Sequence, residues 1–165
     1  MSTQADLQAL PTSRKLALGA AALLIINSFL SWYHASVGSI SVSQSGWHQL
    51  GTIAWIIVIG FVVWEGLRVA KLVGTEPRQA DLISAGIGAA ALLFALIFVI
   101  QRLSDGYLGF AFFLGVILLV VFAYALLQIF NAAGGQEALK AAQEQAAARR
   151  AANQNDQDPP APPSA

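Results

Sequence analysis

Four long apolar runs, separated by short polar segments, dominate the pattern of this chain. Each run is close to the ~20 residues that cross a bilayer as an α-helix. The runs contain no Asp, Glu, Lys or Arg apart from Glu65 and Arg68 in the second. We therefore predict an all-α membrane protein, a four-transmembrane-helix bundle, with spans at about residues 16–33, 50–69, 82–100 and 107–130.

Composition and charge agree with this class and exclude others. Hydrophobic residues make up 56% of the chain and charged residues only 11%, far from the averages of soluble domains. Nine basic and nine acidic residues give no net charge that would attract nucleic acid. Without cysteine, the chain has neither disulfides nor thiolate sites, and it carries none of the common catalytic or nucleotide-binding motifs. We expect no enzyme, no cofactor and no metal.

Basic residues are distributed unevenly around the predicted spans. Of the nine, only Arg102 lies in the loop between the third and fourth spans, and none lies in the loop between the first and second. By the positive-inside rule, both termini are then cytoplasmic and the loops after spans one and three face outward from the plasma membrane. The basic residues on the inner side are Arg14, Lys15, Arg68, Lys71, Arg78, Lys140, Arg149 and Arg150.

The two ends of the chain differ in composition from the spans. Residues 1–13 are expected to be a flexible N-terminal segment before the transmembrane domain of residues 14–130. Residues 131–152 are rich in Ala and Gln, which favours a cytoplasmic helix or linker without an apolar face. The Asn, Asp and Pro content of residues 153–165 predicts a disordered tail.

The first outer loop alternates apolar and polar residues around Gly38-Ser39. This pattern is typical of a small β-hairpin with a two-residue turn, in which Val37 pairs with Ile40. One face of the hairpin is then apolar, and we expect it to lie on the rim of the bundle. The members of this face are Tyr33, Ala35, Val37, Ile40 and Val42.

Aromatic and apolar residues of the same loop form a candidate outer interaction surface. Trp and Tyr side chains favour the boundary between membrane and water, where a membrane-protein partner would meet them. The predicted surface consists of Trp32, Tyr33, Val37, Ile40, Val42 and Trp47.

Polar residues inside the spans are a second set of candidates. Asn27, Ser28 and Ser31 should turn inward and bond neighbouring helices, or they could line a site for a neutral ligand. Glu65 lies near the end of its span with Arg68 three residues later. This spacing indicates an ion pair or snorkelling at the interface, with proton coupling as the alternative.

Histidines and small residues leave two further hypotheses open. His34 and His48 both fall in or beside the outer loop, either as ordinary loop residues or as a shared metal or pH-sensing site. Small residues recur at four-residue spacing in spans three and four, which allows close helix packing within the bundle or in a homo-oligomer. These residues are Ala85, Gly86, Ala89, Ala90, Ala91, Ala95, Ala111 and Gly115.

Three short features of this chain resemble those of other small membrane proteins. The chain has Phe29-Leu30-Ser31-Trp32-Tyr33, then Ser45-Gly46-Trp47, and a short second outer link with Gly106. In these features it resembles small four-span integral membrane proteins common in actinobacteria, most of unknown function. The resemblance covers about residues 14–130 and implies a multi-pass membrane protein without assigning catalytic residues.

Three functions fit this sequence. The first is a non-catalytic accessory or scaffold component of a cell-envelope assembly, bound to membrane lipids and a membrane-protein partner. The second is a small channel or transporter for a neutral or lipophilic solute that passes Asn27, Ser28 and Ser31. The third is an envelope sensor that uses His34 and His48.

Overall fold

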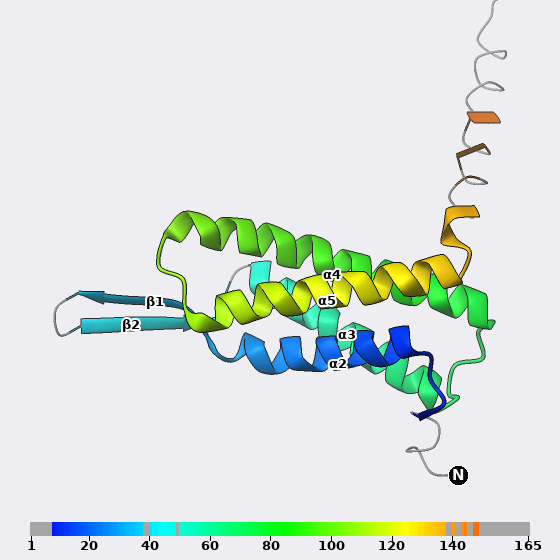
Figure 1. The fold of residues 1–165 in the computed structure, drawn as a ribbon, viewed down its shortest axis with the longest axis horizontal. Helices are drawn as coiled ribbons and strands as arrows, with labels where there is room; N and C mark the ends of the chain where they lie inside the picture. Colours follow the sequence, from blue (N-terminus) through cyan, green and yellow to red (C-terminus); the bar gives the residue numbers. More distant parts are fainter. Residues whose placement is uncertain are drawn as a thin grey trace, which may run out of the picture. The chain divides into compact units, whose positions relative to one another are not determined.

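The computed structural model describes residues 8–37, 40–48 and 50–137, together with residues 140, 143, 144, 147 and 148. The chain divides into two units, residues 1–133 and 134–165. The first contains a helical bundle and a hairpin (Figure 1). Its elements are α2 (Thr12–Ser28), β1 (Ser31–Val37), β2 (Ile40–Ser45), α3 (Leu50–Val69), α4 (Pro77–Asp105) and α5 (Phe110–Ala132).

In the second unit, the described residues from 135 onward are helical. The expectations for the first seven residues, for the Gly38-Ser39 turn and for the tail of residues 153–165 lie outside the described residues.

The four long helices of the first unit pack in a closed order. Helix α2 contacts α3 and α5, and α4 contacts the same two helices. The third and fourth apolar helices of the chain, α4 and α5, thus pack against each other.

Within the described residues, three helices are long and apolar enough to cross a membrane, namely α3, α4 and α5. The membrane-protein prediction is confirmed to that extent. Large apolar side chains are exposed along the outward face of these helices, as expected for surfaces that meet lipid rather than water. On α5 alone they include Phe110, Phe113, Ile117, Val120, Tyr124 and Leu127.

The predicted first span is wrong at its C-terminal end. Helix α2 ends at Ser28, and the chain enters strand β1 at Ser31 instead of continuing as helix to Tyr33. Helix α5 likewise begins at Phe110 rather than at Tyr107, because Tyr107 O accepts from His34 N and Gly109 N donates to Trp32 O. The segment before α5 thus pairs with β1, and Gly109 is extended, with φ −79° and ψ 165°, so the helix starts only after it.

The predicted hairpin is confirmed, and so is its register. Val37 pairs with Ile40, and Ala35 with Val42, in an antiparallel ladder. The expectation that the apolar face lies on the bundle rim is wrong, because Ile40 is 70% and Val42 49% exposed. Figure 1 shows both strands extending past the ends of the helices. Packing holds only the base of the hairpin, where Tyr33 forms a bridge with Leu108.

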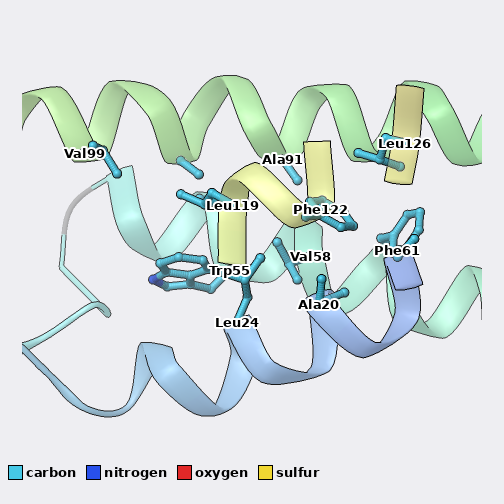
Figure 2. Packing of buried hydrophobic residues seen from close by; sticks show 14 of the residues in the cluster. Ala20, Leu24, Trp55, Val58, Phe61, Ala91, Val99, Leu119, Phe122 and Leu126 are labelled. Atoms are coloured by element: carbon cyan, nitrogen blue, oxygen red, sulfur yellow. The ribbon is translucent and has the colours of Figure 1, made fainter. Parts of the chain in front are cut away.

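Aromatic side chains fill the interior of the bundle. Figure 2 shows Trp55, Val58 and Phe122 pointing into the space between the helices. Phe61 and Phe122 meet edge to face with ring centroids 5.1 Å apart, a favoured geometry for aromatic pairs. Buried alanines, among them Ala54, Ala91, Ala95 and Ala125, let the helices approach closely around these rings.

Candidate functional site

Trp32 lies at the centre of an aromatic cluster where the hairpin joins the bundle. Its side chain is completely buried, and its ring centroid lies 5.3 Å from that of Trp55, 5.4 Å from Phe98 and 5.9 Å from Phe112. The expectation that Trp32 contributes to the outer surface is therefore wrong. The ladder shifts register between Ser31 and Tyr33, so Trp32 has no partner in β2 and its side chain can turn into the bundle.

Hydrogen bonds fix strand β1 to the two helices beside it, α2 and α5. Trp32 Nε1 donates to Asn27 O at 2.9 Å, and Trp32 O accepts from Gly109 N at 2.9 Å. The side chain of Asn27 is buried, and its Nδ2 donates to Ala111 O at 2.9 Å. The start of the hairpin is thereby bonded to the end of α2 and to the start of α5.

Strand β2 is anchored in the same way as it leaves the hairpin. Gly46 N donates to Ser28 O at 2.9 Å, and Gly46 O accepts from Trp55 Nε1 at 2.8 Å. A Cβ at Gly46 would lie only 2.9 Å from Trp55 Nε1 and 3.1 Å from Trp32 Nε1. The close approach of backbone to two indole rings therefore requires glycine at this position.

The predicted polar cluster is only partly formed. Asn27 and Ser28 turn inward as expected, and both are buried. Ser31 instead belongs to β1, where its hydroxyl donates to Tyr33 O at 2.8 Å. Asn27 Oδ1 is buried without a hydrogen-bond partner. These residues join helices and strand, and the structure brings no third polar side chain of this set to them.

The exposed part of the predicted outer surface is smaller than expected. Trp47 is half-buried with its ring centroid 5.3 Å from that of Phe29, and half-buried Tyr33 meets Tyr107 at 5.9 Å. Ile40 and Val42 remain exposed. We call the apolar hairpin face formed by Ala35, Ile40 and Val42 the hairpin surface.

The hairpin itself carries no charged residue, since no Asp, Glu, Lys or Arg occurs from Ser31 to Leu50. His34 and His48 are both exposed. His34 pairs with Ser43 in the ladder, whereas the His48 ring nitrogen Nδ1 lies 3.2 Å from Trp47 O. In the described part of the chain, no group of three or more His, Cys, Asp and Glu could hold a metal ion.

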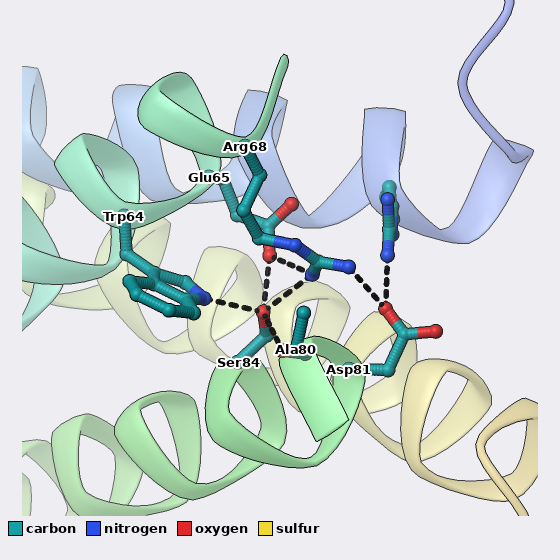
Figure 3. Close-up of polar contacts among 7 residues, drawn as sticks. Trp64, Glu65, Arg68, Ala80, Asp81 and Ser84 are labelled. Carbon is teal, nitrogen blue, oxygen red and sulfur yellow. Dashed lines mark hydrogen bonds and ion pairs between the residues drawn. The ribbon is translucent and has the colours of Figure 1, made fainter. Parts of the chain in front are cut away.

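A buried ionic network occupies the opposite end of the bundle (Figure 3). Glu65 is only 1% exposed, and its Oε1 accepts from Arg68 Nη1 at 2.8 Å. The predicted ion pair is therefore confirmed, but it points into the bundle instead of toward the interface. The Ser84 hydroxyl donates to the same Glu65 oxygen and accepts from Trp64 Nε1 at 3.0 Å. Glu65 Oε2 is buried without a hydrogen-bond partner.

Asp81 extends this network to a third helix. Its Oδ1 accepts from Arg68 Nη2 at 2.8 Å and also from Arg14 of α2. Two arginines and two carboxylates thus balance one another where α2 and α4 begin and α3 ends. Buried charges need such partners, so this network couples the three helix ends.

Sequence reasoning missed Ser84 and the roles of Arg14 and Asp81. The available signal was a basic residue in the first turn of α2 and an acidic residue one turn into α4, two helices that begin at the same end of the bundle.

Comparisons with known protein families, with curated proteins and with solved structures found no match for this chain.

Proposed function

We propose that this protein is a non-catalytic, four-span accessory or scaffold component of a cell-envelope assembly, and that the hairpin surface binds a membrane-protein partner. In this proposal α2 is the fourth span, the membrane is the plasma membrane, and both termini are cytoplasmic. The resemblance to small four-span actinobacterial membrane proteins stays a prediction.

The position of α2 supports a fourth span. Its 17 residues correspond to about 25 Å of helix, but the first four, Thr12 to Lys15, are polar, so the support comes from its packing rather than from its length. It packs beside α3 and α5 and exposes Leu16, Leu23 and Ile26 on its outward side. These exposed apolar side chains are favourable in lipid and unfavourable in water.

The exposure of Ile40 and Val42 on an anchored hairpin is the observation that carries the proposed function. Burial of one such side chain contributes about 1.5–3 kcal/mol, a gain that a partner surface can provide. An isolated two-stranded hairpin is marginally stable, but here the bonds of Trp32 and Gly46 to the helices restrain its base. Restraint before binding lowers the entropic cost of association.

The packed interior of the bundle favours a scaffold function rather than a channel function. A path past Asn27 would meet the Trp32 ring, which is enclosed by Trp55, Phe98 and Phe112. No Asp, Glu, Lys or Arg occurs from Leu16 to Trp32, so this segment gives no support to ion or proton coupling. The guanidinium of Arg102 lies over the Phe98 ring, 5.3 Å from its centroid.

Affinity purification after in-cell crosslinking tests the proposed surface. The variant Ile40→Ser/Val42→Ser should lose a near-stoichiometric partner that wild-type protein retains. The matched control Ser41→Ala/Ser43→Ala changes the opposite face of the same strand and should retain the partner. Equal recovery from both variants would contradict the proposal.

The absence of cysteine allows a direct test of the four-span topology. Single substitutions Thr12→Cys, Ser43→Cys and Gly74→Cys place one thiol before α2, in the hairpin and between α3 and α4. A membrane-impermeant maleimide should label only Ser43→Cys in intact cells. Labelling of Thr12→Cys and Ser43→Cys from the same side would show that α2 does not cross.

A further inference from the structure

We propose that the groove between α4 and α5 binds one acyl chain of an anionic phospholipid, with Arg78 beside the headgroup. This inference is independent of the hairpin surface. It is based on the shape of the groove, on its length relative to one leaflet, and on the charge at its end.

The groove is an apolar hollow of about 360 Å³ on the outward side of the two helices. On α4, the small residues Ala85, Gly86 and Ala89 lie between the larger Leu82 and Leu92. A second hollow of about 320 Å³ shares Leu92 with it and continues along the same helix pair. The apolar lining of the two hollows therefore matches a hydrocarbon chain that lies along the helix axes.

The length of the first hollow corresponds to one leaflet. Leu82 and Leu92 are ten residues apart, which is about 15 Å of helix at 1.5 Å per residue. The hydrocarbon core of a bilayer is about 30 Å thick, so one chain from one leaflet extends about 15 Å. A chain that starts at Leu82 would therefore end where the second hollow begins.

A positive charge lies at the end of the groove where α4 begins. Arg78 is exposed, and its Nε donates to Ala133 O at 3.0 Å, just beyond the end of α5. Leu82 follows Arg78 by one helical turn, and Phe130 precedes Ala133 by about one turn, and both line the groove. The guanidinium thus lies within one turn of the groove, where a lipid phosphate would be.

At the same end of the bundle, the carboxylate of Asp81 pairs with Arg14 and Arg68. Arginine suits a phosphate since its planar group can donate several hydrogen bonds at once. An anionic phospholipid complements both parts of this arrangement, the cationic end and the apolar groove.

Native mass spectrometry of the full chain in detergent tests this proposal, with phosphatidylglycerol and phosphatidylcholine added in equal amounts. Wild-type protein should retain one phosphatidylglycerol preferentially. Gly86→Leu should lose the bound lipid by filling the groove, whereas Gly60→Leu should keep it. A Cβ at either glycine would have no atom within 4 Å, so the two substitutions are matched.

Changes at Arg78 give an independent readout that leaves the groove unfilled. Arg78→Gln should lower the preference for phosphatidylglycerol about fivefold, and Arg78→Lys, which keeps the charge but loses the planar donor group, should lower it less. Equal lipid retention by the Gly86→Leu and Gly60→Leu variants would overturn the proposal, as would an unchanged preference in Arg78→Gln. A dimer that disappears in Gly86→Leu while lipid retention is unchanged would assign the groove to a second copy of this chain and would also overturn it.

Discussion

Replacement of Gly115 by alanine should destabilise the bundle by forcing the Trp32 ring out of its position. Gly115 lies in α5, directly beside the aromatic cluster at the base of the hairpin. An added Cβ would be 2.4 Å from Trp32 Cη2, 2.5 Å from Trp32 Cζ2 and 2.8 Å from Asn27 Nδ2. Contacts this short require a neighbour to move.

The surrounding packing determines the size of the effect. Trp32 cannot retreat easily, because its ring is enclosed by Trp55, Phe98 and Phe112 and its Nε1 is bonded to Asn27 O. Overpacking of such a site costs about 1–3 kcal/mol. Alanine also favours helix over glycine by up to about 1 kcal/mol, which would partly hide the steric cost.

Gly60→Ala provides the matched control, because it makes the same helical substitution where no atom lies within 4 Å of the new Cβ. The propensity gain cancels between the two variants and leaves the steric cost of about 1–3 kcal/mol. Thermal unfolding in detergent should therefore place Gly115→Ala about 2–12 °C below Gly60→Ala. Equal melting temperatures would refute the argument that Trp32 is held rigidly against α5.

Three further predictions concern the ionic network and the solute hypothesis. Glu65→Leu should destabilise the bundle by about 3–5 kcal/mol in the same thermal assay. The reason is that Arg68, whose side chain is only 8% exposed, would lose one of its carboxylate partners. A destabilisation below about 1 kcal/mol would contradict the role of this buried ion pair. Arg14→Ala should cost up to about 1 kcal/mol, since its pair with Asp81 is partly exposed, and Lys15→Ala, which removes an exposed contact to a backbone oxygen, should cost less. Purified protein in liposomes should move a neutral tracer no faster than empty liposomes do, and flux that disappears in Asn27→Leu would instead support the channel alternative.

Hydropathy predicted the bundle well where helix and apolar run coincide. Helix α3 has the expected bounds of residues 50–69. Helix α4 extends beyond the predicted 82–100 at both ends, because its first and last turns are polar and hydropathy does not detect them. The predicted first span extends too far because hydropathy scores Trp32 as apolar whether it lies in a helix or in a strand. Only the tertiary contacts of Trp32 show that it belongs to a strand and is buried in the bundle.

Local spacing predicted part of the candidate sites. The three-residue separation of Glu65 and Arg68 identified their ion pair, and alternation around Gly38-Ser39 identified the hairpin register. The contacts of Arg14 with Asp81 join residues 67 positions apart, which no local pattern indicates. Exposure of the hairpin surface also depends on how the strands leave the bundle, which is a tertiary property.

A photo-crosslinking residue at position 40 would test the central claim most directly, because it reports what touches the hairpin surface in living cells. The account predicts one discrete heavier adduct that contains a second membrane protein. The same probe at position 41, on the opposite face of the strand, should give much less of it. Equal adduct yields at positions 40 and 41, or no protein adduct at position 40, would contradict a partner-binding role for this face.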